Sequence, residues 1–353
     1  MIDLNAPERF AAIDPLKMLE HIAGFPAQCG EGWRIAQGLS LPDDYSQVRQ
    51  VVVCAMGGSA IGGDLMRTLL QPECKVPIIV HRDYGLPAFA DDNTLVIVGS
   101  HSGNTEESLS GFDQGLRVGA KMLAITSGGE LAARAQDVGI PLLRYNYVGQ
   151  PRAALGYSFM GMLAAMQKLG FSTDKAFEVK EAITGMQRLQ TAIRETVPTS
   201  RNAAKQIAHR LHHRIPMIYA AEHLSAVARR WQLQFNENSK CTAIAEVFPE
   251  LDHNAVAGYP YPAALGQYLH VILLTSTLYS SRMPARLEVT GDLLRHHDIP
   301  YEVVEAQGKS LLAQILWTTH VADYVSYYLA MLYDADPWEI EDIRLLKEHL
   351  ARA

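Results

Sequence analysis

Two short loops in the first third of the chain combine glycine with hydroxyl side chains in a way that suits a small anion. The stretch "SHSGNTEES", residues 100–108, follows the apolar run "TLVIVG", and "AMGGSAIGG", residues 55–63, follows the β-branched run "VRQVVVC". Glycine lets a backbone approach a ligand closely, and free N–H groups at the start of a helix favour negative charge. A phosphate group, with three acceptor oxygens, matches such a set of donors.

The residues expected to hold the phosphate come from both loops: Gly58, Ser59, Ser100, Ser102 and Thr105. Each loop taken alone is explained equally well as a strand-to-helix turn with a hydroxyl cap. Two such loops on neighbouring strands form a stronger pattern, because ligands bind at the carboxyl ends of parallel strands. Neither loop has the GxxxxGK[ST] or GxGxxG spacing, which disfavours a nucleoside triphosphatase and a dinucleotide site.

Short apolar runs alternate with helical segments along the chain and predict an α/β fold. We expect two tandem domains, each a parallel sheet flanked by helices. Residues 1–150 form the N-terminal domain with the two phosphate loops, and residues 151–353 form a helical connector, the C-terminal domain and a closing helix with Pro337 in its first turn. Since the hydroxyl-rich loop occurs only in the first half, we expect one ligand site per chain.

Composition excludes several classes of partner. The 353 residues carry a formal net charge of −7 and contain no dense Lys/Arg block, which argues against nucleic acid and against an anionic membrane surface. No apolar stretch is long enough to span a bilayer, and the polar N-terminus does not resemble a signal peptide. The four cysteines show no CxxC spacing, so we expect reduced thiols and a cytoplasmic protein.

Several motifs resemble a known family. "GGSAIGGD", "SHSGNTEE" and "AITSGG" resemble the sugar isomerase (SIS) domain, a flavodoxin-like module that binds phosphorylated sugars. "GQPRAALGYSF", "FNENSKCTAIAEVFPELDHNAVAGY" and the closing helix resemble the bifunctional phosphoglucose/phosphomannose isomerases in particular. The resemblance implies two packed SIS domains with a sugar phosphate between them, a homodimer with shared active sites, and no metal or other cofactor.

The resemblance also implies roles for four further residues. Glu237 would be the catalytic base, His253 the ring-opening residue supplied by the partner subunit, and Arg152 and Lys347 would line the site. The chemistry agrees with these residue types. Moving a carbonyl between C1 and C2 of a sugar needs a base, histidine transfers protons near neutral pH, and a permanent cation stabilises an enediolate. We therefore expect an aldose–ketose isomerase acting on glucose 6-phosphate and fructose 6-phosphate, and on mannose 6-phosphate as a further candidate substrate.

Two other functions remain open at this level. A non-catalytic SIS-domain regulator that senses a sugar phosphate would need the loops but no base, and it would usually carry a DNA-binding helix pair, for which the N-terminal segment is too short and too acidic. An amidotransferase-type isomerase without its glutaminase domain is the other alternative, and the absence of an N-terminal cysteine nucleophile disfavours it. One departure from the family pattern concerns substrate choice: Trp338 follows the Asp-Pro pair before the last helix, where the family pattern has a threonine.

Overall fold

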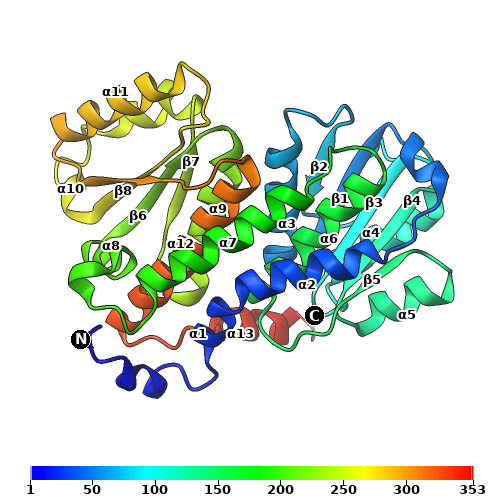
Figure 1. Ribbon diagram of the computed structural model, residues 1–353, viewed down its shortest axis with the longest axis horizontal. Coiled ribbons are helices and arrows are strands. Elements are labelled where there is room, and N and C mark those ends of the chain that lie inside the picture. The colour runs from blue at the N-terminus through cyan, green and yellow to red at the C-terminus, as the bar shows by residue number, and fades with distance from the viewer. Residues whose placement is uncertain (1, 351, 353) are drawn as a thin grey trace.

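The computed structural model describes residues 2–350 and 352, and it contains two α/β units side by side (Figure 1). The first unit has a parallel sheet of five strands in the order β2-β1-β3-β4-β5. Its strands are β1 (Gln50–Ala55), β2 (Ile78–His81), β3 (Thr94–Ser100), β4 (Lys121–Thr126) and β5 (Leu142–Arg144). Every residue of β3 is buried, as expected for a parallel strand covered on both faces.

Alternate residues of β1 feed two hydrophobic clusters, one on each face of the first sheet. Val52 packs with residues of α4 and α5, whereas Val51 and Val53 pack with residues of α2, α3 and α6. These helices are α2 (Phe25–Gln37), α3 (Gly57–Leu70), α4 (Glu106–Val118), α5 (Gly129–Asp137) and α6 (Leu155–Lys168). Helix α6 lies in the predicted connector, yet it packs on the first sheet between α2 and α3.

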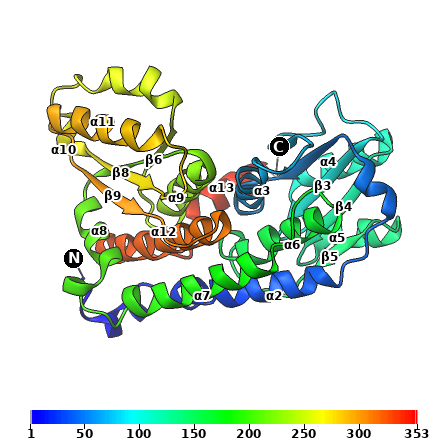
Figure 2. The same cartoon turned by 45° about the horizontal axis from the view of Figure 1, so that its top comes forward.

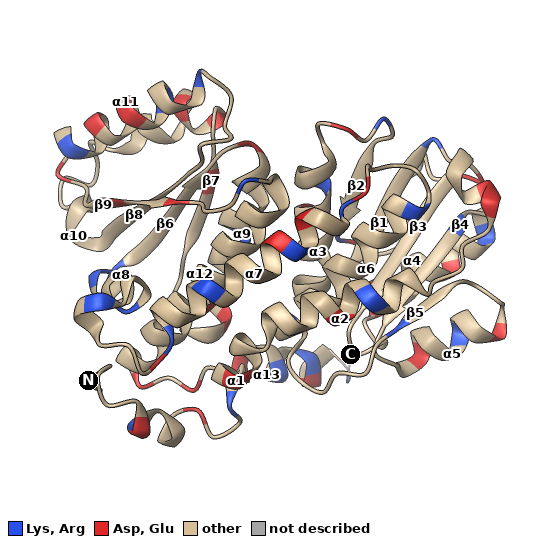
Figure 3. Cartoon of the chain, in the orientation of Figure 1, with Lys and Arg blue, Asp and Glu red and all other residues tan. Residues whose placement is uncertain are grey.

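The second unit repeats this plan with four parallel strands in the order β7-β6-β8-β9. The strands are β6 (Ile215–Ala220), β7 (Ile244–Val247), β8 (Leu269–Thr275) and β9 (Tyr301–Glu305). The helices are α8 (Ala203–Leu211), α9 (Ser225–Asn238), α10 (Leu265–Tyr268), α11 (Met283–His296) and α12 (Leu311–Tyr333). The central strands β1, β3, β6 and β8 carry no Lys, Arg, Asp or Glu, and these charges lie mainly on helices and loops (Figure 3).

Three helices lie outside the two sheet units proper: α1 (Met18–Ala23), α7 (Ala176–Ile193) and α13 (Glu341–Leu350). Helix α7 packs against α2 of the first unit and against α8 and α12 of the second, so it bridges the two units (Figure 2). The predicted α/β fold with two parallel sheets is therefore confirmed. The closing helix begins at Glu341, and Pro337 belongs to the segment before it, which corrects the predicted start.

The long apolar helix α12 is buried within the chain. Almost all of its residues are inaccessible, and α7, α8 and α9 pack around it. Its hydrophobic surface is thus explained as core and does not by itself indicate a subunit interface. In the part of the chain that the structure describes, no helix is both long enough and apolar enough to cross a membrane.

Candidate active site

The two predicted phosphate loops meet at one edge of the first sheet. Strand β1 pairs with β2 on one side and with β3 on the other, so the order of strands along the sheet reverses between β1 and β3. The carboxyl ends of these two strands lie side by side, with Ala55 paired to Gly99. This is the position at which open parallel sheets bind ligands. Adjacency of the loops, which the sequence only suggested, is therefore a property of the fold.

The hydroxyl side chains are held by short hydrogen bonds within the second loop. Ser100 Oγ lies 2.8 Å from Thr105 Oγ1 and accepts from the N–H of Gly103 at 3.0 Å. Ser102 is exposed, and its Oγ accepts from the N–H of Asn104 at 3.2 Å. Thr105 occupies the cap position of α4 without using its side chain as a cap. Its hydroxyl is therefore directed to Ser100 and the loop interior, while that of Ser102 is open to solvent.

Close backbone packing explains two of the loop glycines. Gly103 has φ +74°, and a Cβ there would lie 1.9 Å from the carbonyl oxygen of Gly128. Gly58 packs closely against the backbone of Pro151 and Arg152. A Cβ at position 58 would lie 2.8 Å from the Arg152 backbone nitrogen. Gly58 thus brings the first phosphate loop into contact with Arg152. Ser59, the next residue, is buried beside Gly99.

Arg152 is the buried cation of this candidate site. Its side chain is 1% exposed, and Nε donates to Asn238 Oδ1 at 2.8 Å. Nη2 donates to the backbone carbonyls of Pro337 at 2.7 Å and Trp338 at 2.9 Å. Burial lowers the pKa of Arg152 to about 10, which still leaves it charged at neutral pH. The buried guanidinium is thus held by hydrogen bonds to α9 and to the segment before α13.

Glu237 lies at the last turn of α9, facing this cation. Its Oε2 is 3.4 Å from Arg152 Nη1, and its side chain is 21% exposed. The next residue, Asn238, is buried and donates to Ser326 Oγ on α12 at 3.0 Å, which anchors the end of α9. The result is a carboxylate with access to solvent, next to a cation that keeps its charge. Such a pair suits proton abstraction beside a carbonyl.

Lys240 was not predicted from the sequence as a site residue. It adopts φ +52°, and its Nζ donates to the carbonyl of Glu237 at 3.1 Å and also to the carbonyl of Asp336. Burial of the amine, followed by repulsion from Arg152, lowers the pKa of Lys240 to about 8. Its place in "NENSK", three residues after the expected base, is the one signal that could have indicated it.

His253 does not join this group within one chain. Glu237 precedes β7, whereas His253 ends a short 3-10 turn, Glu250–His253, that follows β7. A four-residue strand extends about 13 Å, so the two side chains lie toward opposite ends of it. His253 is exposed. Its location leaves the prediction of a role in the partner's site open.

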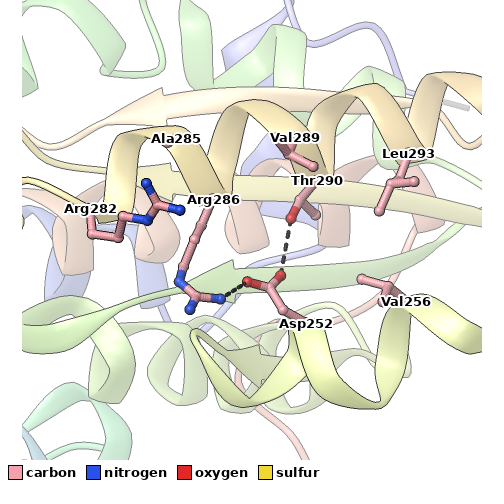
Figure 4. Close-up of a pocket in the computed structure, with 8 residues that line it drawn as sticks. All are labelled: Asp252, Val256, Arg282, Ala285, Arg286, Val289, Thr290 and Leu293. Atoms are coloured by element: carbon pink, nitrogen blue, oxygen red, sulfur yellow. Dashed lines mark hydrogen bonds and ion pairs between the residues drawn. The ribbon is translucent and has the colours of Figure 1, made fainter.

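The residue before His253 is firmly anchored. Asp252 accepts from Arg286 Nη1 at 2.7 Å and from Thr290 Oγ1 at 3.2 Å, both on α11 (Figure 4). A groove of about 320 Å³ runs between this turn and α11. The anchor attaches the turn that carries His253 to a helix of the second unit, so the exposed histidine projects from a fixed base.

Lys347 and Trp338 lie on either side of the start of α13. Every described residue of α13 is exposed, including Lys347, and the structure does not bring Lys347 into contact with Arg152 or Glu237.

The indole of Trp338 packs against His21 of α1, with ring centroids 5.0 Å apart. His21 Nδ1 in turn lies 2.5 Å from the hydroxyl of Tyr147. This aromatic group adjoins Arg152, and the polar N-terminal sequence gave no sign of it.

Comparisons with known proteins show which family and fold this chain is similar to. Residues 200–350 match the family model described as the bacterial phospho-glucose isomerase C-terminal SIS domain. A protein of Caldicellulosiruptor bescii named bifunctional phosphoglucose/phosphomannose isomerase is 37% identical, over 95% of this chain and 99% of that protein. One with the same name from Aquifex aeolicus is 33% identical, over 88% of this chain and 92% of the relative. The crystal structure of a hypothetical protein from Thermus thermophilus shares the fold, with a TM-score of 0.76 at 17% identity, covering 98% of this chain and 93% of that one.

Proposed function

This chain belongs to the bifunctional phosphoglucose/phosphomannose isomerase family, and we propose that it interconverts glucose 6-phosphate and fructose 6-phosphate, with mannose 6-phosphate as a second substrate. The observation that carries the proposal is the contact chain from Gly58 through Arg152 to Glu237. It joins a phosphate loop, a buried cation and a carboxylate in one site. A regulator that only binds sugar phosphate would not need the last two.

In the proposed mechanism, the hydroxyls of Ser59, Ser100, Ser102 and Thr105 and the backbone at Gly58 hold the phosphate. Glu237 then removes the proton from C2 of the open-chain aldose, and the electrons move to the carbonyl at C1, which forms an enediolate. Arg152 stabilises the negative charge on the enediolate oxygen. Glu237 returns the proton to C1 while the hydroxyl proton on O2 passes to O1, so that the carbonyl now lies at C2 and the ketose results. The reaction needs no net oxidant or reductant, because one proton moves between the two carbons and one between the two oxygens.

Ring opening requires a proton transfer at the ring oxygen, which we assign to His253 of a second copy of the chain. The separation of Glu237 and His253 along β7 supports a shared site, and so does the exposed apolar face of α13, which includes Ile343, Leu346 and Leu350. We propose a two-fold symmetric homodimer in which Lys347 approaches the substrate. We also propose a cytoplasmic location, in keeping with four unpaired cysteine thiols in the described part of the chain.

A coupled assay tests the proposed reaction directly. Purified protein is given glucose 6-phosphate or mannose 6-phosphate, and fructose 6-phosphate formation is followed together with exchange of the C2 proton into solvent. Glu237→Gln keeps the shape of the side chain and removes the base, so kcat is expected to fall by about 10²–10⁴ with binding retained. Glu288→Gln, on the exposed face of α11, is the matched control. Full C2 exchange in the Glu237 variant would assign the base to another residue.

The shared site has its own test. Chains carrying Glu237→Gln and chains carrying His253→Ala are each expected to be nearly inactive. Mixing and refolding them should restore activity if the histidine crosses to the partner, because one site of the mixed dimer then has both residues. Failure of the mixture to regain activity would show that His253 does not act in the partner's site.

A further inference from the structure

The second unit contains a counterpart of the first phosphate loop. Strand β6 pairs with β7 and β8 in the same way that β1 pairs with β2 and β3. Each sheet therefore reverses its strand order at one point, which in the second unit is where the turns after β6 and β8 meet. Such a point is where a parallel sheet would bind a ligand. The two units nevertheless carry different residues at this position.

The first difference lies in the turn after the central strand. Gly57 is the second residue after β1 and has φ +46°, while Glu222 is the second residue after β6 and has φ +45°. The two turns thus share a left-handed backbone conformation that is unfavourable for a residue with a side chain. A Cβ placed on Gly57 would meet no atom within 4 Å, so this position in the first unit is open space. In the second unit, a glutamate side chain occupies it.

The carboxylate of Glu222 makes the contacts that an anion would make. Oε1 and Oε2 both accept from the backbone N–H of Ser280, at 3.0 and 3.1 Å. Oε1 also accepts from the Ser280 hydroxyl at 2.6 Å. Ser280 belongs to the connection between β8 and α11, which corresponds to the hydroxyl-rich loop between β3 and α4. A backbone N–H and a hydroxyl from that connection are the donor types that hold a phosphate.

Two further polar groups of this turn have partners inside the protein. The N–H of Ala221 donates to the Tyr279 hydroxyl at 3.1 Å, and His223 Nε2 lies 3.0 Å from Gln314 Oε1. A cavity of about 270 Å³, lined in part by Thr68, Gln71 and Leu278, opens next to Glu222. Space for an external ligand therefore exists beside the carboxylate, but the N–H and hydroxyl of Ser280 and the N–H of Ala221 are already engaged.

We propose that Glu222 replaces a phosphate group in the second unit and thereby limits the chain to one phosphate site. Its carboxylate supplies the negative charge that the strand-to-helix turns of this fold attract, and it excludes phosphate by occupying the donors and by repelling a second anion. The inference rests on the proposed function only in identifying the first site. The behaviour of the second unit is measured separately.

The test counts phosphate sites by calorimetric titration with inorganic phosphate. The wild-type chain is expected to bind one equivalent that fructose 6-phosphate displaces. Glu222→Gly suits the left-handed backbone and removes the carboxylate, so it should bind a second, weaker equivalent. Glu222→Gln keeps the side chain and its acceptor, so it should still bind one. In a Ser102→Ala/Thr105→Ala background, the second equivalent should persist while the first weakens. A Glu222→Gly chain that binds no more phosphate than the wild type would overturn the proposal.

The reverse exchange decides the matter if Glu222→Gly does not fold. Gly57→Glu places the same side chain at the same φ in the first unit, where it should close the first site and raise the KM for substrate at least a hundredfold. Gly57→Asn, an uncharged residue that tolerates this conformation, should cause a smaller rise. An unchanged KM in the Gly57→Glu variant would show that this position does not face the anion. A wild-type chain without isomerase activity would instead count against the proposed function, and the phosphate count of Glu222→Gly would still stand.

Discussion

Arg152→Lys keeps the positive charge and should nevertheless disable the protein, because the geometry of the guanidinium is what the structure uses. Arg152 donates to Asn238 on α9 and, from a different nitrogen, to the carbonyls of Pro337 and Trp338 before α13. A lysine has a single nitrogen on a differently shaped side chain. It can reach one of these two groups of acceptors, but it cannot bridge them in the same plane.

The size of the effect follows from the bonds lost. If lysine keeps one of the three hydrogen bonds shorter than 3 Å, two bonds from a charged donor disappear, at about 1.5–3 kcal/mol each. The free energy of unfolding should therefore fall by about 3–6 kcal/mol, a large part of the roughly 5–15 kcal/mol that is usual for a domain. The cation would also move relative to Glu237. A displacement of about 1 Å lowers kcat by about 10²-fold, so we expect a loss of at least that size.

Urea unfolding and the coupled isomerase assay measure the two effects separately. Activity is recorded without urea, where the folded fraction of the variant is checked by circular dichroism. Arg229→Lys is the matched control, since Arg229 lies exposed on the same helix as Glu237. A change in unfolding free energy below about 1 kcal/mol together with unchanged kcat would refute the reasoning. It would mean that the charge of Arg152 suffices and that its bridging contacts contribute little.

Three further predictions concern the phosphate, the sugar and pH. Ser102→Ala combined with Thr105→Ala should raise KM at least tenfold, since each lost hydrogen bond to a charged group costs about 1.5–3 kcal/mol; steady-state kinetics with an unchanged KM would remove these hydroxyls from the site. The kcat/KM for glucose 6-phosphate should be at least tenfold higher than that for mannose 6-phosphate, and Trp338→Thr should reduce this ratio. Equal kcat/KM values for the two sugars in both the wild type and the variant would show that the indole does not select between them. Because the pKa of Lys240 falls to about 8 in the folded chain, below its value of about 10.4 when unfolded, the unfolded state binds more protons between these values. The free energy of unfolding should thus gain from this group as pH rises from about 8 to about 10. In urea unfolding at these two pH values, Lys240→Asn, which tolerates the left-handed backbone, should show a smaller change in this free energy than the wild type. An equal change in both chains would contradict the lowered pKa of Lys240.

The sequence by itself determined the features that depend on neighbouring residues. Apolar runs such as "TLVIVG" predicted buried parallel strands, because a strand covered on both faces must be apolar at every position. The glycine and hydroxyl residues after β1 and β3 predicted the anion loops, because turn chemistry is local. The closing helix was placed less well. The helix was predicted, but it begins at Glu341, and the carbonyl of Pro337 instead accepts from Arg152, a residue far away in the sequence.

The tertiary structure decided everything that depends on contacts between distant segments. That Arg152 faces Glu237 and binds the carbonyl of Trp338 follows from packing the two units against each other, which no local pattern encodes. The same holds for Glu222, an ordinary glutamate in the sequence, whose carboxylate accepts from Ser280 because the fold brings the connection after β8 beside it. The opposite ends of β7 likewise set His253 apart from Glu237, although the two are close in the chain. Sequence patterns report short-range preferences of backbone and burial, whereas a site of this kind is assembled from side chains whose distances only the folded chain defines.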